Sequence, residues 1–381
     1  MIKNVVIVND FNYVQGGASK VAIDTANLLA KKNINVYFFS ASLDKSKLDS
    51  SIVNVCTNQG ECLKNGIKGA LRGIKNKQAG KEFSKLLDKL NKEETIIHIH
   101  GWTKCLSSVV FKVAHKKQFK TVLTLHEYFT VCPNGGFFNY KRCKQCNLKP
   151  MSFRCIKCNC DSRNYLFKLY RVIRQRRYKK DMNNLEYGIA ISELVKEKTN
   201  IKNTKVIENP IQSSNKVDIS NNDTYIYIGR VCKEKGTELF CKAICDLKLK
   251  GIVVGDGSEL EYLKNKHIDI TFTGWVDNPN EYLDKSKCLI FPSIWPEPAG
   301  LTALNAISRG IPVIVSSDTA TIEYIKKYNA GLIFKNNDVE DLKEKIKSFS
   351  FDKDIYTRYQ NNPYSEEKYI NSILDYYEEI I

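Results

Sequence analysis

Short apolar strands alternate with helical segments twice along this chain, and this alternation restricts the fold more than any other feature. In the first series, the apolar segments are KNVVIV, INVYFFS, IIHIHG, TVLTL and YGIAIS. Residues 18–31, 67–90 and 106–117 between them have helical spacing. Strands joined by helices form right-handed βαβ units and a parallel sheet. The pattern predicts a doubly wound α/β domain in the first half of the chain.

A second series begins at TYIYIGR and continues through GIVVG, ITFTG, CLIFPS, PVIVSS and GLIF. We expect its helices near residues 237–245, 259–265, 301–308 and 365–381. A polar stretch with one Pro, residues 206–224, separates the two series, and 381 residues are too many for one hydrophobic core. The sequence therefore predicts two Rossmann-like domains, residues 1–210 and 211–363, with a ligand in the cleft between them.

Composition excludes several other classes of protein. Apolar residues make up 43% of the chain and charged residues 27%, which is typical of a folded globular protein rather than a coiled coil or a collagen-like repeat. No apolar run approaches the length of a membrane span, and the apolar stretch near Met1 is too short for a signal peptide, so we expect a cytoplasmic location. The net charge of +17 favours acidic partners such as nucleic acid, anionic membranes or phosphorylated small molecules.

Two cations lie at a predicted strand end in the second series. Arg230 ends the strand TYIYIGR, and Lys235 follows five residues later at the start of a helix. Arginine forks onto phosphate oxygens, lysine adds a point charge, and a helix N-terminus attracts anions. The pair predicts a diphosphate site; two surface cations beside a turn are the alternative.

The segment PSIWPEPAGLTALNAISRGIPVIVSS carries a second group of candidate residues. Glu297 could accept hydrogen bonds from sugar hydroxyls, and Gly300 would let a ligand approach the free N–H groups at a helix N-terminus. Asn305 follows two helical turns later and could reach ribose hydroxyls. Together with the two cations, this segment predicts a site for a nucleotide sugar.

At these residues the chain resembles glycosyltransferase family 4, a group of retaining enzymes with the GT-B fold. The family's signature has a Glu, seven residues and a second Glu before a Gly-Pro-Val-like strand, and EPAGLTALNAISRGIPVIVS matches except that Asn305 replaces the second Glu. The resemblance continues through QGGASKVAIDTANLLA, LTLHEYF, ENP, GRVCKEKG, VVGDG and FTGWVDN, nearly the whole chain. It implies two domains facing across a cleft, with a terminal helix over residues 364–381 that packs back on the first.

The resemblance also implies roles for individual residues. His126 would lie beside the donor sugar, Arg230 and Lys235 would hold the diphosphate, and Glu297 would hold the sugar hydroxyls. Gly16 and Gly17 would form the first loop, Trp275 and Val276 the base site, and Asn305 the ribose site. The backbone donors would come from Ala299, Gly300, Leu301 and Thr302. Because Asn305 replaces a carboxylate, we expect nucleotide affinity to be more affected than the chemistry.

The family's chemistry gives the expected reaction. The resemblance implies transfer of a hexose from a nucleotide-diphosphate sugar with retention, the leaving phosphate taking the acceptor proton and no side chain acting as nucleophile. Positioned cations and helix N-termini can stabilise that leaving group without a catalytic metal. Relatives that build capsule, O-antigen or other lipopolysaccharide chains imply a polyprenyl-diphosphate-linked glycan as acceptor, at the inner face of the cell membrane.

Six of the thirteen cysteines lie within a predicted insert at residues 130–162. Two Cys-x-x-Cys pairs in this insert could hold a structural zinc ion. The paired spacing alone selects Cys143, Cys146, Cys155 and Cys158, whereas relatives with a similar cysteine-rich insert imply Cys132, Cys146, Cys155 and Cys160. Free or redox-active thiols and an iron–sulfur cluster are the alternatives.

A strongly basic segment follows the insert. Residues 163–180 contain eight basic residues and no acidic one, with Leu166, Leu169, Tyr170 and Ile173 on one helical stripe. This pattern suits an anionic membrane surface and also a helix that packs its stripe on the domain. The charge and the cysteines admit a zinc-containing nucleic-acid-binding protein, but that reading leaves the second half unexplained, so we expect no nucleic-acid partner. Another GT-B-fold enzyme, such as a nucleotide-sugar epimerase or a phosphorylase, is the remaining alternative.

Overall fold

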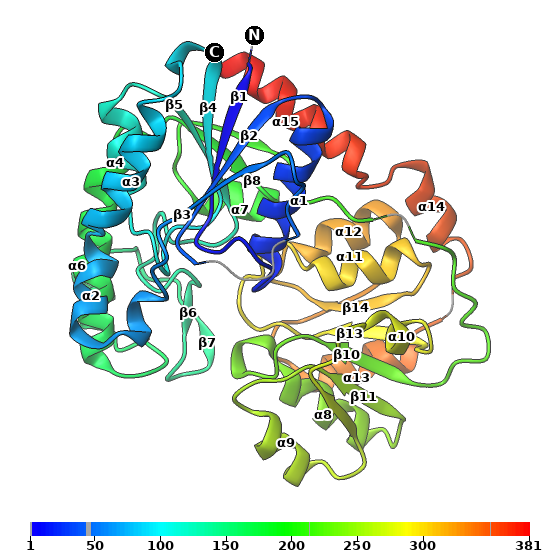
Figure 1. The fold of residues 1–381 in the computed structure, drawn as a ribbon. Coiled ribbons are helices and arrows are strands. Elements are labelled where there is room, and N and C mark those ends of the chain that lie inside the picture. The colour runs from blue at the N-terminus through cyan, green and yellow to red at the C-terminus, as the bar shows by residue number, and fades with distance from the viewer. Residues whose placement is uncertain (1, 43–46, 213, 351) are drawn as a thin grey trace.

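The computed structural model describes residues 2–42, 47–212, 214–350 and 352–381. It contains two α/β halves, each built on one parallel β-sheet (Figure 1). The predicted fold class, GT-B with two Rossmann-like domains, is confirmed by these sheets and by the structural matches reported below. The predicted linker over residues 206–224 includes Ser213, which lies outside the described residues.

The N-terminal sheet has seven parallel strands in the order β3-β2-β1-β4-β5-β8-β9. Their bounds are β1 (Asn4–Val8), β2 (Asn35–Ser40), β3 (Val53–Cys56), β4 (Thr95–Ile99), β5 (Lys120–Leu125), β8 (Tyr187–Ala190) and β9 (Asn203–Val206). The central strands are apolar on both faces because helices cover both, as a parallel sheet requires. The edge strands β3 and β9 were not predicted, since their exposed polar residues, as in NTKV, hide the strand pattern.

Helices of this half form two separate cores with the sheet. The helices and short 3-10 turns are α1 (Gly17–Lys31), η1 (Cys62–Lys64), α2 (Gly66–Ile74), α3 (Lys77–Leu87), η2 (Lys92–Glu94), α4 (Val109–Lys116), α5 (Phe153–Lys157), α6 (Tyr165–Asp181) and α7 (Glu193–Lys198). Apolar residues of α3, α4 and α6 belong to the core on one sheet face, and those of α1 to the core on the other. The single helix predicted over residues 67–90 is two helices, because Asn76 caps α3 by accepting a hydrogen bond from Ala79 N–H.

The C-terminal sheet has six parallel strands in the order β12-β11-β10-β13-β14-β15. Their bounds are β10 (Tyr225–Ile228), β11 (Gly251–Val254), β12 (Thr271–Gly274), β13 (Cys288–Phe291), β14 (Val313–Ser316) and β15 (Gly331–Phe334). The helical elements are η3 (Lys233–Lys235), α8 (Thr237–Asp246), α9 (Leu260–Lys266), α10 (Asn280–Leu283), α11 (Leu301–Ser308), α12 (Thr321–Tyr328), α13 (Val339–Ser348) and α14 (Ile355–Asn361). α11, α12 and α14 cover one face, and α8 and α13 the other.

The last helix, α15 (Glu366–Ile380), returns from the C-terminal half to the first domain (Figure 1). It packs against α1, where the hydroxyls of Tyr369 and Thr25 lie 2.7 Å apart. Its buried tyrosines and isoleucines belong to the same core as α1 and β1. α15 therefore ties the two halves together through the chain itself.

The cysteine-rich insert lies between β5 and α6 and contains the short antiparallel pair β6 (Phe138–Asn139) and β7 (Lys144–Gln145), followed by α5. In Figure 1 this pair hangs below the first sheet, near the second half. Within the described residues, no helix is both long and apolar enough to cross a bilayer.

Candidate active site

One loop of the C-terminal half is clamped by side chains of the N-terminal half. The Tyr128 hydroxyl donates to Pro296 O at 2.8 Å, and the Ser192 hydroxyl donates to Pro298 O at 2.6 Å. Glu297 lies between these two carbonyl groups in sequence and is buried. The clamp thus holds the Glu297 carboxylate at the boundary between the two domains.

Three donors converge on one oxygen of Glu297. Lys235 Nζ forms an ion pair with Oε2, which also accepts hydrogen bonds from Trp295 Nε1 at 2.7 Å and from Ser293 Oγ at 3.1 Å. Oε1 has no hydrogen-bond partner among the described residues, so it can accept from a ligand hydroxyl. Lys235 also lies 5.3 Å from the centre of the Trp295 ring, which keeps its charge close to the carboxylate.

Backbone geometry explains how Lys235 reaches the loop that carries Glu297. Gly236 has a positive φ of 68°, and a Cβ there would lie 2.0 Å from Pro292 O, so only glycine lets Lys235 approach the 292–297 loop this closely. Arg230 remains largely exposed, with Nη2 at 3.6 Å from Glu234 Oε1. A loose, partly solvated pair of this kind leaves the guanidinium free to move onto an anionic ligand.

Two helix N-termini face each other across the domain boundary. Gly300 precedes α11 with φ 65°, and a Cβ there would lie 1.9 Å from Thr321 Cγ2. Across the boundary, a Cβ added to Gly17 would meet Leu301 Cδ1 at 3.8 Å, so the start of α1 lies against the start of α11. The first N–H groups of a helix have no acceptor within it, and the two termini together favour an anion. Ala299 and Leu301 pack on the N-terminal core, next to Thr302.

His126 ends a row of three imidazoles, of which His98 and His100 are buried and His126 is half-buried. His98 is hydrogen-bonded to the Tyr377 hydroxyl at 2.5 Å and to the Thr124 hydroxyl at 2.6 Å. The rings of His98 and His100 have centroids 4.1 Å apart, and His100 Nδ1 lies 3.0 Å from His126 Nε2. Burial lowers the pKa of His98 to about 3 and that of His126 to about 4. All three imidazoles are therefore neutral at neutral pH, and His98 joins α15 to the sheet.

The hydrogen bonds also assign the tautomer of His126. His100 Nε2 is buried without a partner among the described residues. An unpaired buried N–H is rarer than an unpaired buried acceptor, so the His100 proton belongs on Nδ1, where it is donated to His126 Nε2. His126 then carries its own proton on Nδ1. It offers a neutral hydrogen-bond donor rather than a general acid.

Glu127 is a cleft residue that the sequence reasoning missed. Crowding by the surrounding protein raises the pKa of its carboxyl group, although the side chain keeps contact with solvent, and the charges of Lys104, Arg230 and Lys235 act in the opposite direction. Its position directly after His126 at the end of β5 was the available signal, since carboxyl ends of parallel strands line the ligand site.

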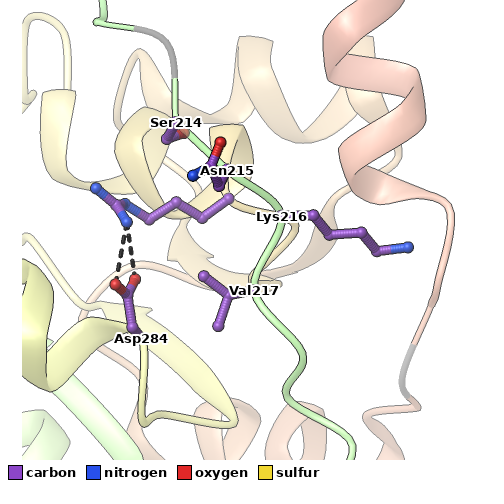
Figure 2. A pocket seen from close by; sticks show the side chains of 6 residues that line it. Ser214, Asn215, Lys216, Val217 and Asp284 are labelled. Carbon is purple, nitrogen blue, oxygen red and sulfur yellow. Dashed lines mark hydrogen bonds and ion pairs between the residues drawn. The ribbon is translucent and has the colours of Figure 1, made fainter.

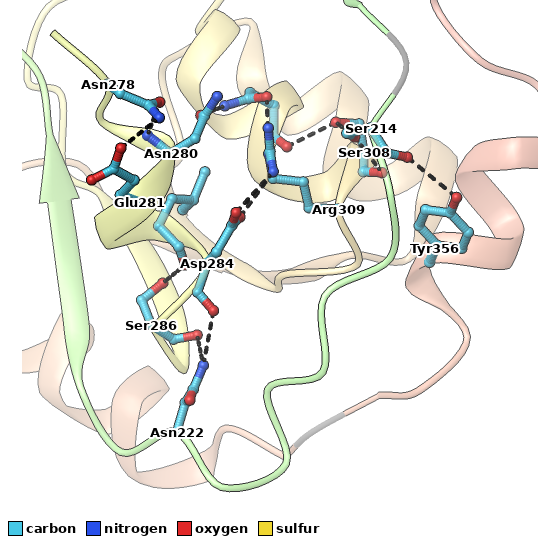
Figure 3. Close-up of polar contacts among 12 residues, drawn as sticks. Ser214, Asn222, Asn278, Asn280, Glu281, Asp284, Ser286, Ser308, Arg309 and Tyr356 are labelled. Carbon is cyan, nitrogen blue, oxygen red and sulfur yellow. Dashed lines mark hydrogen bonds and ion pairs between the residues drawn. The ribbon is translucent and has the colours of Figure 1, made fainter.

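Asn305 is already held at both ends of its amide. Its Nδ2 donates to Asn280 Oδ1 at 2.8 Å, and its Oδ1 accepts from Arg309 Nε at 3.4 Å (Figure 3). Arg309 in turn forms a two-pronged ion pair with Asp284, with Nη1 at 2.9 and 3.1 Å from its carboxylate oxygens. Trp275 follows the end of β12 and is strongly exposed, while Val276 packs beside the core that includes α11.

Two cavities lie near the elements that form the site. One of about 570 Å³ is lined by residues 214–217, Asp284 and Arg309 (Figure 2), at the opposite end of α11 from Gly300. The other, of about 480 Å³, lies at the domain boundary between α7, Pro296 and the insert residues Gln145 and Asn147. The second borders the clamped loop on the side of the insert.

The insert contacts the loop that carries Trp295 and Glu297. Gln145 Nε2 donates to Ile294 O at 3.1 Å, and a Cβ on Gly136 would meet the Trp295 ring at 3.4 Å. The insert therefore packs against the loop that orients Glu297.

The cysteines of the insert surround a buried lysine. Lys168 Nζ lies 3.2 Å from Cys160 Sγ and 3.6 Å from Cys155 Sγ, and Asn134 Nδ2 donates to Cys160 Sγ at 3.1 Å. Within the ranges that the structure describes, no three His, Cys, Asp or Glu side chains are grouped so that they could hold a metal ion. Zinc binding by Cys132, Cys146, Cys155 and Cys160 therefore stays a prediction.

Fold and geometry together define a GT-B-fold protein in which a lysine–glutamate ion pair and two helix N-termini meet at the domain boundary. Residues 211–366 match the sequence profile of the family described as "Glycosyl transferases group 1". This match covers the C-terminal half, which carries Arg230, Lys235 and Glu297.

Relatives and solved structures agree with that match. An uncharacterized 41.2 kDa protein in the cps region of Klebsiella pneumoniae is 26% identical over 183 residues, 45% of this chain and 49% of the relative. An uncharacterized glycosyltransferase of Methanocaldococcus jannaschii is 25% identical over 221 residues, 53% of this chain and 62% of the relative. The chain thus spans less than two thirds of these relatives.

The structural matches extend over the whole described fold. Sucrose-phosphate synthase from Thermosynechococcus elongatus matches with a TM-score of 0.72 at 16% identity, covering 99% of this chain and 98% of that one. Anabaena HepE in complex with UDP-glucose matches with a TM-score of 0.68 at 14% identity, covering 99% of each chain. At these identities the likeness establishes the GT-B fold.

Proposed function

We propose that this protein is a retaining glycosyltransferase that transfers a hexose from a nucleotide-diphosphate sugar to a lipid-linked glycan. The observation that carries the proposal is the ion pair of Lys235 with Glu297 just before the N-terminus of α11, with Arg230 near enough that its charge, like theirs, acts on Glu127. These groups combine anion-binding donors with a carboxylate that has one oxygen free for hydroxyls. The family match over residues 211–366 supports the same reading.

The donor would be held by its two ends. Arg230, Lys235 and the first N–H groups of α11 bind the diphosphate, while Glu297 Oε1 and His126 Nδ1–H bind hydroxyls of the sugar. Arg230 would exchange its loose pair with Glu234 for phosphate oxygens. We assign the base to the exposed Trp275 and its neighbour Val276, and the ribose to Asn305, which is hydrogen-bonded to Asn280.

Transfer then requires one bond to break and one to form. The bond between the anomeric carbon and the leaving phosphate oxygen breaks, and the electron pair goes to the diphosphate, whose charge Arg230, Lys235 and the helix N-terminus stabilise. The acceptor hydroxyl oxygen attacks the anomeric carbon from the face that the phosphate leaves. Its proton passes to the departing phosphate oxygen, so neither His126 nor Glu297 needs to change protonation state.

Two similar proteins guide the choice of substrates. The Klebsiella relative is encoded in a cps region, which favours surface-polysaccharide synthesis, and HepE is solved with UDP-glucose. We propose a UDP-sugar as the first donor to test and a polyprenyl-diphosphate-linked glycan as the acceptor class, met at the inner face of the cell membrane. A zinc ion in the insert would serve only to hold that segment together.

The first experiment measures donor binding. We expect one nucleoside diphosphate among UDP, GDP and ADP to raise the melting temperature of the purified full chain by several degrees at about 100 times its dissociation constant. Arg230→Ala should reduce that shift, whereas Arg358→Ala, at an arginine remote from the cleft that pairs with Asp352, should leave it unchanged relative to its own baseline. Absence of any shift with all three nucleotides would contradict the proposal.

A further inference from the structure

The short helix α2 is oriented opposite to an ordinary surface helix. Its glycines face the protein: a Cβ on Gly69 would lie 1.9 Å from Cys62 O, and one on Gly73 would lie 2.3 Å from the Tyr170 hydroxyl. Its large apolar residues face solvent, with Ile67 82% exposed and Leu71 62% exposed, one helical turn apart. A surface helix normally buries such residues, so their exposure on the same face of α2 requires an explanation.

The neighbouring helix α6 extends this apolar surface. Leu166 is 75% exposed and Ile173 is 53% exposed, and Tyr170, which lies between them on the stripe, packs against Gly73 of α2. The two helices contact each other along the outer edge of the N-terminal half (Figure 1). We call the surface formed by Ile67, Leu71, Leu166 and Ile173 the outer face.

The cations around the outer face differ from those that point inward. Within α6, Lys168 and Arg174 are buried, and Arg171 and Arg177 pair with Asp161 and Asp181. The exposed cations of the two helices and their ends form no ion pair within the described ranges; they are Lys68, Lys75, Arg176, Lys179 and Lys180. The chain from 62 to 81 and from 162 to 180 contains no acidic residue. This positive charge is complementary to an anionic surface.

The outer face also adjoins the first loop of the candidate active site. Gln15 Nε2 donates to Glu61 Oε1 at 3.1 Å, and Glu61 directly precedes η1 and α2. Gln15 is two residues before Gly17, which lies against the start of α11. A surface bound through α2 and α6 would therefore be close to the N-terminal wall of the cleft.

We propose that the outer face is the surface through which this protein lies on an anionic lipid bilayer. Ile67, Leu71, Leu166 and Ile173 enter the headgroup boundary, and the unpaired lysines and arginines bind lipid phosphates. The proposal deepens the proposed function and rests on it for its purpose, because it brings the cleft to where a lipid-linked acceptor would be found. Binding to the bilayer itself needs neither donor nor acceptor.

The test is co-sedimentation of the full chain with vesicles, without any nucleotide. We expect binding to vesicles of phosphatidylcholine mixed with phosphatidylglycerol, weak binding to phosphatidylcholine alone, and weaker binding as salt is raised. The double variant Ile67→Ser, Leu71→Ser should partition about tenfold less. The matched control is Val53→Ser, Ile268→Ser, which removes two apolar side chains that are 49% and 84% exposed elsewhere.

A second pair of variants tests the charge. Lys68→Gln, Lys75→Gln should also weaken vesicle binding, by about thirtyfold, because each basic residue near an anionic surface contributes about 1 kcal/mol. The control Lys202→Gln, Lys347→Gln removes the same charge from exposed lysines of other segments and should have little effect. Equal binding by test and control pairs would overturn the proposal.

Other occupants of the outer face give different results. If Ile67→Ser, Leu71→Ser converts a dimer into a monomer and leaves vesicle binding unchanged, the face is an interface between copies and the proposal is wrong. Salt-sensitive RNA binding that these variants abolish, with no vesicle binding, would also overturn it. Nucleotide binding is measured on the same samples: vesicle binding without it would refute the proposed function alone, and the reverse would refute only the membrane surface.

Discussion

The cations of the cleft and those of the outer face are held in opposite ways. In the cleft, Lys235 is paired with Glu297 and Arg230 with Glu234, whereas Lys68 and Lys75 beside the outer face form no ion pair within the described residues. Lys235 is kept in place by its partner, and the looser pair of Arg230 can be exchanged for a ligand with stronger anionic groups. Unpaired cations among exposed apolar residues suit a diffuse anionic surface. The pairing of cations at each place in the fold, rather than the net charge of the chain, therefore distinguishes a site for a small ligand from a surface for a large one.

The largest expected effect comes from breaking the paired set in the cleft. Lys235→Ala and Glu297→Gln should each lower kcat by about 10²–10³-fold, the usual loss when one positioned group that stabilises a transition state is removed. The measurement is initial-rate transfer or donor hydrolysis, with circular dichroism to confirm folding. Lys250→Ala and Glu261→Gln, on exposed residues of the same half, are the controls. Near-normal rates in either cleft variant would break the comparison.

Two glycines show how crowding differs between the cleft and the outer face. Gly300 and Gly66 both have positive φ values, 65° and 57°, but a Cβ would clash with Thr321 at the first and meet nothing within 4 Å at the second. Gly66→Ala should lower the free energy of unfolding by about 1–2 kcal/mol, the cost of the left-handed backbone. Gly300→Ala should lower it by at least about 1 kcal/mol more, because the buried Thr321 must shift. Urea unfolding measures both, and equal losses would contradict the crowding seen at α11.

The buried histidines predict a smaller effect that depends on pH. The folded-state pKa values of His98 and His126, about 3 and about 4, lie below the usual 6.5, so the unfolded chain binds more protons between these limits. The free energy of unfolding should fall as pH falls from about 6.5 toward 4, by at most about 1.4 kcal/mol per pH unit for each histidine. His98→Gln should flatten this slope in urea unfolding. The exposed His115→Gln should leave the slope unchanged, and a slope unaffected by His98→Gln would contradict the assignment.

Sequence reasoning worked where the site is contiguous and failed where it is assembled from distant segments. Glu297, Gly300 and Asn305 belong to one loop and helix, so their spacing predicted a strand end and a helix N-terminus. The contact of Gln145 with Ile294, and the hydrogen bond from His100 to His126, join elements that are far apart in the chain. No local pattern encodes them.

The helices at the outer face show the same limit of sequence-based prediction. The basic composition of residues 67–90 predicted one helix, because charge and periodicity continue across the junction. The break occurs where the buried Asn76 side chain finds tertiary partners, including Cys105 O at 2.9 Å. Likewise, the glycines of α2 show which way that helix faces only once Cys62 and Tyr170 are seen against them. Helical spacing defines a stripe, and its neighbours decide whether the stripe is buried.

The smallest expected effect concerns Asn305, whose amide is paired with neighbouring side chains. Asn305→Glu restores the carboxylate of the resembled family's signature beside Arg309, which already lies 3.4 Å from the Asn305 side-chain oxygen. Hydrogen bonds from ribose hydroxyls to a carboxylate are roughly twice as strong as those to an amide. We expect nucleoside diphosphates to bind a few-fold more tightly, measured by calorimetry. Asn278→Glu adds the same charge on the neighbouring loop, where Asn278 contacts Glu281 instead, and should not tighten binding. If both variants changed affinity equally, Asn305 would act through general charge rather than by contacting the ribose, and its assignment to the nucleotide site would fail.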